Sequence, residues 1–182
     1  MNEITIQILT PDNFSELSLD SFIRRQTVTE RWVNKGGTLR LEHACFTDDW
    51  DIGLRREIAG RMLDNLRRGY IGLGAFDGST LIGWTFFGNE LCGSRGNYIE
   101  LDMFHVSEPY RGKGVGRKLF TASLPYVRKT GAEKIFISAH SSKESQAAYK
   151  ALGCVPAQEF FPRAAQEEPC DIQLEYDLTR IS

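Results

Sequence analysis

The stretch Arg111-Gly112-Lys113-Gly114-Val115-Gly116 joins a predicted strand at residues 98–106 to a predicted helix that begins inside the stretch. N–H groups at the start of a helix carry partial positive charge, and residues without a Cβ let these groups approach an oxyanion closely. Arg117 adds to the positive charge of Arg111 and Lys113. The stretch therefore predicts a phosphate-binding turn, and a flexible, solvated basic turn is the alternative.

Two common phosphate motifs do not fit this stretch. A dinucleotide-binding turn needs G-x-G-x-x-G, but Arg117 stands at the place of its third glycine, and the chain contains no G-x-x-x-x-G-K-[ST] string. The residues instead resemble the GNAT superfamily of N-acetyltransferases. Its cofactor motif, [Q/R]-x-x-G-x-[G/A], is met by Arg111, Gly114 and Gly116.

A second signature of that superfamily is similar to residues 142–154. Ser142 precedes Tyr149 by seven positions, and Lys150 and Gly153 follow as in K-x-x-G-F, with Cys154 in place of the usual phenylalanine. The resemblance covers residues 99 to 154, whereas residues 1 to 97 follow the family in element order alone. It implies an acyl-coenzyme A N-acyltransferase fold with acetyl-coenzyme A as the co-substrate.

The hydrophobic periodicity predicts an α/β fold, with a central mixed sheet flanked by helices. We expect a second helix to begin at Thr10-Pro11-Asp12, and residues 22–50 to form a helix followed by an irregular segment around Gly36-Gly37. Pro125 predicts a kink or an early end of the helix near Thr121. The remaining predicted elements are strands at residues 4–8, 70–76, 80–87, 134–139 and 171–178 and helices at residues 51–69 and 142–152.

The composition restricts the class of protein. A chain of 182 residues with 41% hydrophobic content suits one domain, residues 1–182. A net charge of -2 argues against nucleic-acid binding, and no apolar run is long enough to suggest a membrane span. The four cysteines have no spacing typical of a metal site or a disulfide framework. We expect a soluble cytoplasmic protein without a metal, and a homodimer stays open.

The catalytic candidates begin on the strand at residues 98–106. Strict alternation places Glu100, Asp102, Phe104 and Val106 on one face and Ile99, Leu101, Met103 and His105 on the other. Two carboxylates about 7 Å apart on a partly buried strand raise one another's pKa, which suits a general base. The resemblance favours Glu100, which lies 11 positions before Arg111, and leaves Asp102 to the substrate side. The alternative is that both carboxylates face solvent or pair with Arg55 or Arg61.

Tyr149 is the candidate general acid, because its phenol can donate the proton that a thiolate leaving group needs. The alternative is a core aromatic residue. The resemblance also implies that main-chain groups at Phe104 and Val106, freed by a strand bulge, pair with the pantetheine arm, while Ser142 either caps its helix or contacts that arm. The predicted cofactor-binding residues are Phe104, Val106, Arg111, Gly112, Lys113, Gly114, Val115, Gly116, Arg117, Ser142 and Tyr149.

The acceptor is less defined by the sequence. Asp48, Asp49 and Asp51, with the aromatic Trp32 and Trp50, favour a small cationic amine, and we place Trp32 on the substrate side. One alternative is an enzyme that acetylates proteins or peptides. A non-catalytic acyl-coenzyme A-binding module is the other, and Glu100 and Tyr149 argue against it.

Overall fold

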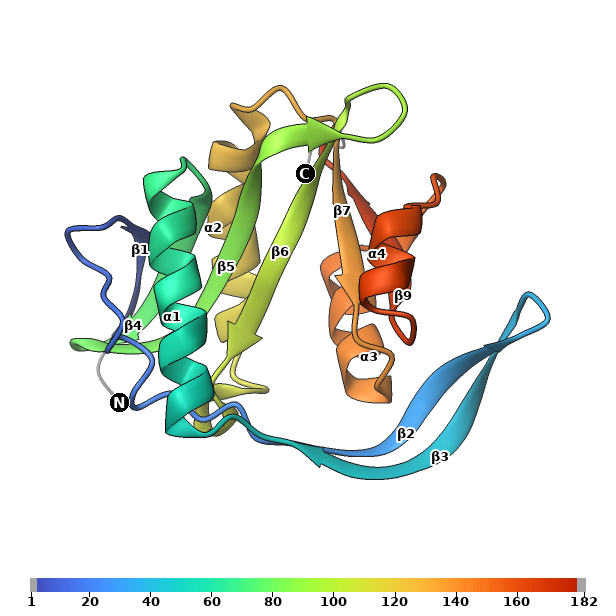
Figure 1. Cartoon of the computed structure of the whole chain (residues 1–182), viewed down its shortest axis with the longest axis horizontal. Helices are drawn as coiled ribbons and strands as arrows, with labels where there is room; N and C mark the ends of the chain where they lie inside the picture. Colours follow the sequence, from blue (N-terminus) through green and yellow to red (C-terminus); the bar gives the residue numbers. More distant parts are fainter. Residues whose placement is uncertain (1–2, 180–182) are drawn as a thin grey trace.

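A computed structural model describes residues 3–179. It contains a seven-stranded mixed sheet in the order β1-β4-β5-β6-β7-β9-β8, with helices packed on both faces (Figure 1). The predicted fold class is thus confirmed. The elements are β1 (Ile4–Leu9), β2 (Gln26–Lys35), β3 (Thr38–Asp48), α1 (Ile52–Arg67), β4 (Ile71–Asp77), β5 (Thr80–Cys92), β6 (Tyr98–Val106), a 3-10 turn (Glu108–Tyr110), α2 (Val115–Arg128), β7 (Lys134–Ala139), α3 (Lys143–Leu152), β8 (Val155–Pro156), α4 (Pro162–Glu167) and β9 (Ile172–Asp177).

Helix α1 shows how local sequence sets these boundaries. Asp51 caps α1 by accepting a hydrogen bond from the N–H of Leu54 at 2.8 Å, and the buried face of α1 includes Ile58 and Met62. Gly69 ends this segment with a φ of 90°, a left-handed conformation that favours glycine. The helix predicted at residues 51–69 is confirmed because its cap, its apolar face and its terminal glycine all agree.

The sheet divides between β6 and β7. These parallel strands pair only at Tyr98–Lys134, Ile99–Ile135 and Glu100–Phe136, and beyond those pairs they diverge (Figure 1). On its other side β6 pairs with β5, and there the consecutive residues Phe86 and Phe87 oppose Met103 and Leu101. Asp102 is therefore an extra residue in a β-bulge.

The bulge corrects the predicted alternation along β6. Ile99 and Leu101 pack in the core cluster on the α2 side, and Phe104 packs against the same cluster. Met103 instead packs against the cluster on the α1 side, and the His105 ring lies 5.4 Å from that of Trp84. Met103 and His105 thus do not share a face with Ile99 and Leu101, because one inserted residue inverts the alternation.

The prediction for residues 22–50 was wrong. These residues contain the hairpin β2–β3, which extends away from the main sheet (Figure 1). Gly36 and Gly37, with φ angles of 61° and 87°, form its turn, and the N–H of Gly37 donates to Asn34 Oδ1 at 2.8 Å. A Gly-Gly pair is a signal for a two-residue hairpin turn, and assigning the pair to an irregular segment missed it.

Two smaller expectations also fail. Residues 10–22 form turns rather than a helix, since Asn13 accepts from the N–H of Thr10 and donates to Ile8 O, both at 2.8 Å, and such bonds compete with helix formation. Helix α2 continues past Pro125 to Arg128. Pro125 is exposed, while Leu124 and Val127 are buried in the core, so packing outweighs the lost hydrogen bond.

Candidate active site

A cavity of about 890 Å³ occupies the region where β6 and β7 diverge. Its lining combines residues of β6, β7, α3, the glycine-rich stretch, the base of the β2–β3 hairpin and the segment from α4 to β9. The predicted site residues in this lining are Glu100, Asp102, Phe104, Val106, Arg111, Gly112, Gly114, Val115, Gly116 and Tyr149. Those outside it are Trp32, Lys113, Arg117 and Ser142.

The glycine-rich turn presents main-chain groups to this cavity. Gly112 and Gly114 have φ angles of 71° and 80°, and a Cβ built on either would meet no atom within 4 Å. Gly114 is the N-cap of α2 and has no side chain, so the first N–H groups of the helix remain available to a ligand. At Gly116 a Cβ would lie 3.2 Å from Phe104 Cζ, which shows how closely α2 packs on β6. The turn fits an anion such as a pyrophosphate.

The basic side chains around the turn hold it in place. The Nε of Arg111 donates a hydrogen bond to the main-chain oxygen of Val106, at the end of β6, at 2.8 Å. Its guanidinium thereby connects the turn to two neighbouring segments. The three further bonds to main-chain oxygens are Arg111 Nη1 to Arg25 O, Lys113 Nζ to Pro109 O and Arg117 Nη2 to Ala151 O, each at 2.7 Å.

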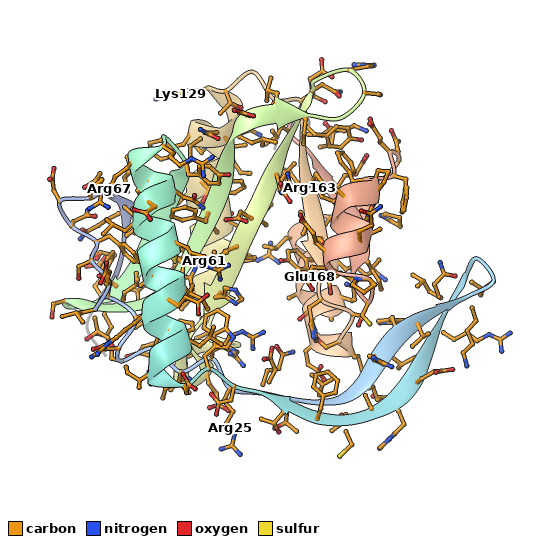
Figure 2. The ribbon with its side chains drawn as sticks, viewed as in Figure 1. Arg25, Arg61, Arg67, Lys129, Arg163 and Glu168 are labelled. Atoms are coloured by element: carbon orange, nitrogen blue, oxygen red, sulfur yellow. The ribbon has the colours of Figure 1, made fainter. Side chains whose placement is uncertain are left out.

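Glu100 and Asp102 line the opposite part of the cavity. Burial raises the pKa of both carboxyls, and the charge of Asp102 raises that of Glu100 further. The charge of Arg163 opposes both shifts, and Arg61 opposes the shift of Asp102; Figure 2 shows these arginines beside α4 and on α1. Among the described residues, neither carboxylate has an ion-pair partner within 4 Å. A carboxyl in this position accepts a proton more readily than an exposed one, as a general base requires.

Arg55, an expected alternative partner, is engaged elsewhere. Its Nη1 donates to the main-chain oxygens of Asp20 and Phe22 at 2.6 and 2.8 Å. The guanidinium therefore fixes the turns before β2.

Tyr149 extends from α3 to the cavity. Its ring centroid lies 6.0 Å from that of Phe104, and burial raises the pKa of its phenol well above the usual range. The phenol is therefore protonated at neutral pH, as a proton donor must be.

Ser142 and Trp32, two of the predicted site residues, do not line the cavity. Ser142 is fully buried as the N-cap of α3, where it accepts from the N–H of Ser145 at 3.3 Å and from Gln26 Nε2 at 3.0 Å. Ser142 thus takes the capping role, one of the two that were expected, and its hydroxyl is enclosed by Gln26 and Ser145. Trp32 lies on the hairpin, where its main-chain N–H donates to the main-chain oxygen of Ser141 at 2.8 Å, and it does not line the cavity.

The hairpin base supplies Arg24, Asp48 and Trp50 to the cavity; the sequence had indicated Asp48 and Trp50 for the amine, but not Arg24. Arg24, 7% exposed, forms an ion pair with Asp48 at 2.8 Å, and its guanidinium carbon lies 5.4 Å from the centre of the Trp50 ring. The rings of Trp50 and His105 are 4.9 Å apart. Burial, with the charges of Arg24 and Arg111, lowers the pKa of His105 to about 3, so this imidazole is uncharged.

A further acidic segment follows α4. Glu167, Glu168 and Asp171 line the cavity, and with Glu100 and Asp102 they form what we call its acidic side. On β7, Ser138 and His140 line it too. The period of two could have identified the β7 residues, but no pattern in the sequence brings residues 167–171 beside β6.

Within residues 3–179, no group of three or more His, Cys, Asp or Glu residues is arranged to hold a metal ion. Nor does any helix in this range have the length and hydrophobicity of a membrane span. The four cysteines are unpaired.

A sheet that divides between two parallel strands, with an anion-binding turn on one side and carboxylates on the other, defines the class of acyl-coenzyme A-dependent transferases. The comparison with family models agrees. The model of the acetyltransferase (GNAT) family matches residues 37–154. The chain therefore belongs to the GNAT family of acetyltransferases.

Solved structures show the same fold. Nourseothricin acetyltransferase superposes with a TM-score of 0.71 at 14% identity, over 96% of this chain and 98% of that one. A putative streptothricin acetyltransferase from Bacillus anthracis, in complex with acetyl coenzyme A, superposes with a TM-score of 0.66 at 15% identity, over 95% of this chain and 96% of that one. The PaiA N-acetyltransferase of Thermoplasma acidophilum, in complex with coenzyme A, superposes with a TM-score of 0.63 at 18% identity, over 96% of this chain and 99% of that one. No curated protein sequence matches this chain.

Proposed function

We propose that this protein transfers the acetyl group of acetyl-coenzyme A to the primary amine of a small molecule. The observation that carries the proposal is one continuous cavity that joins the turn at α2 to Glu100 and Tyr149. Membership of the GNAT family supports it, as do similar structures that contain acetyl coenzyme A or coenzyme A. The unpaired cysteines fit a reducing cytoplasm.

The residues of the turn and of β6 suit the co-substrate. The N–H groups at the start of α2 would hold the pyrophosphate, since Gly112 and Gly114 leave the approach open. Among the described residues, β6 has no strand partner on its β7 side beyond Glu100, and Phe104 and Val106 line the cavity there. An extended chain with amide groups, such as pantetheine, can pair with that strand edge.

Two residues carry the proton transfers. Acetyl-coenzyme A supplies the acetyl group as a thioester. Glu100 takes one proton from the ammonium group of the acceptor, and the neutral nitrogen forms its bond to the carbonyl carbon as the C–S bond breaks. Tyr149 gives its proton to the leaving sulfur and recovers one from the acylated nitrogen, so that the products are the amide, the thiol and the proton on Glu100.

The acidic side favours a cationic small molecule as the acceptor. Its carboxylates line the cavity and can pair there with a bound cation. The antibiotic acetyltransferases among the similar structures agree with a small acceptor. Acetylation of proteins or peptides is the rival proposal, and a module that binds acyl-coenzyme A without catalysis is another.

The test is release of free thiol from acetyl-coenzyme A in the presence of a panel of small primary amines and of peptides. We expect release with small amines, and none with the double variant Glu100→Gln, Tyr149→Phe. Release with peptides alone would support the rival acceptor. Coenzyme A binding without any release would support the non-catalytic module.

A further inference from the structure

Asp171 lies on the β7 side of the cavity, just before β9. Its Oδ2 accepts a hydrogen bond from Ser138 Oγ at 3.4 Å. The last residues that pair between β6 and β7 are Glu100 and Phe136. Asp102 lies two residues beyond Glu100 on β6, and Ser138 lies two residues beyond Phe136 on β7. Asp102 of β6 and Asp171, which contacts Ser138 of β7, therefore border the cavity from its two sides, at the level where the strands diverge.

Among the described residues, the groups that shift the pKa of Asp171 include no cation. Its neighbours include Glu168 at the end of α4 and Tyr149 of α3, while Glu144 of α3 lines the same cavity. His140, the next cavity residue on β7, has its pKa lowered by burial and so is uncharged at neutral pH. Among the described residues, Asp171 has no ion-pair partner within 4 Å.

Within residues 3–179, this carboxylate thus has a hydrogen bond from Ser138 but no cationic partner within 4 Å. Burial and the charge of Glu168 raise the pKa of Asp171 to about 6, and the hydrogen bond from Ser138 opposes that shift. Half-buried carboxylates are stabilised in their charged form by a nearby cation. The cavity is open to a ligand at this point, so a bound ammonium group can supply that cation.

We infer that Asp171 is a specificity-determining residue, which binds the ammonium group of the incoming amine from the β7 side of the cavity. The inference rests on the proposed function and differs from the role of Glu100. Glu100 removes a proton during the reaction and so acts on kcat, whereas Asp171 acts on the acceptor KM. Because Asp171 must be ionised to bind the amine, the acceptor KM rises as the pH falls through about 6.

The direct test uses 1,4-diaminobutane as the probe and the folded, coenzyme A-saturated protein. The ¹³C-carboxyl resonance of Asp171 should titrate near pH 6, and saturating probe should lower that midpoint by about one pH unit, since a cation favours the carboxylate. Asp171→Asn should weaken probe binding roughly tenfold, since a loss of about 1.4 kcal/mol is tenfold in affinity. An unmoved midpoint, or wild-type affinity in the variant, would overturn the inference.

Two neighbouring substitutions keep the inference testable if Asp171→Asn does not fold. Ser138→Ala removes a hydrogen bond to the carboxylate and should move the KM midpoint to higher pH. Glu168→Gln removes a like charge and should move it to lower pH. A purely structural Asp171 would show no such opposite shifts, and their absence would contradict the inference.

Coenzyme A affinity serves as the control, because none of these residues belongs to the glycine-rich turn at residues 111–116. Amine binding by Asp171 without thiol release from any amine would contradict the proposed function and leave the inference intact. Thiol release with a pH-independent acceptor KM would support the proposed function and contradict the inference about Asp171.

Discussion

The two sides of the cavity are built in different ways. The cofactor side comes from consecutive residues, in which β6, a turn and α2 follow one another within residues 98–128. The acidic side combines Glu100 and Asp102 of β6 with Glu167, Glu168 and Asp171, which lie more than 60 positions away along the chain. A contiguous site depends on local backbone conformation, whereas an assembled site depends on how the sheet divides. Substitutions on the two sides should therefore fail in different ways.

The largest effect is expected on the cofactor side. Gly114→Glu should weaken coenzyme A binding roughly 10³-fold, since two lost hydrogen bonds to a charged group cost about 3–6 kcal/mol and the new carboxylate repels the pyrophosphate. Isothermal titration calorimetry on the folded variant measures the affinity.

Gly131→Glu is the matched control. Gly131 lies just beyond the other end of α2, with a φ of 84° and no atom within 4 Å of an added Cβ, so the strain is similar and the cofactor side is untouched. Equal losses of affinity in the two variants would mean that α2 as a whole, and not the turn, governs binding.

Tyr149 lies where the two sides meet. Tyr149→Phe should lower kcat about 10²-fold and leave coenzyme A affinity within a few-fold, because the phenol proton is needed only as charge develops on sulfur. Steady-state kinetics with thioesters of different leaving-group pKa values measure this, and better leaving groups should rescue the variant. A uniform response, with lower melting temperature and affinity, would assign Tyr149 to packing.

Glu100 tests the acidic side. Because burial raises its pKa, the wild-type rate should fall as the pH drops through that pKa and the base becomes protonated. Glu100→Gln should lower kcat/KM about 10²-fold near pH 7 and remove this limb, with a smaller loss at high pH where the amine is neutral without help. Asp102→Asn is the paired variant, and if it alone loses activity, Asp102 is the base.

The smallest effect is expected at Ser142, where a loss of stability is distinguished from a loss of coenzyme A binding. Ser142→Ala removes the cap of α3 and the bond from Gln26, and should cost about 1 kcal/mol of unfolding free energy. Chemical denaturation measures the stability. Coenzyme A affinity should not change, and a tenfold loss of affinity would restore Ser142 to the cofactor side.

The same contrast explains what could be predicted from the sequence. The turn at Gly112–Gly116 could be placed because positive φ angles, a helix start and basic neighbours are all local properties. Glu100 and Tyr149 were brought to one cavity as expected, since the strand and helix that carry them were recognised. The resemblance implied a bulge in this strand, but its position at Asp102 could not be derived, because a bulge is defined by the pairing with β5 and not by alternation within one strand.

The acidic side could not be assembled from the sequence for a physical reason. Asp171 reaches the cavity because β9 pairs antiparallel with β7, a contact between residues more than 30 positions apart. Trp50, and not Trp32, lines the cavity because the hairpin carries Trp32 away from it. Such contacts follow from tertiary packing, so propensity and periodicity do not specify them.

The central claim is that one cavity binds the co-substrate at the α2 turn and presents its thioester to the acidic side. A crystal structure of the protein with coenzyme A tests this most directly. The account predicts the pyrophosphate on the N–H groups of residues 112–117, pantetheine along β6 at Phe104 and Val106, and the sulfur within hydrogen-bonding reach of the Tyr149 phenol. Coenzyme A bound outside the opening between β6 and β7, or with its sulfur remote from Tyr149 and Glu100, would contradict it.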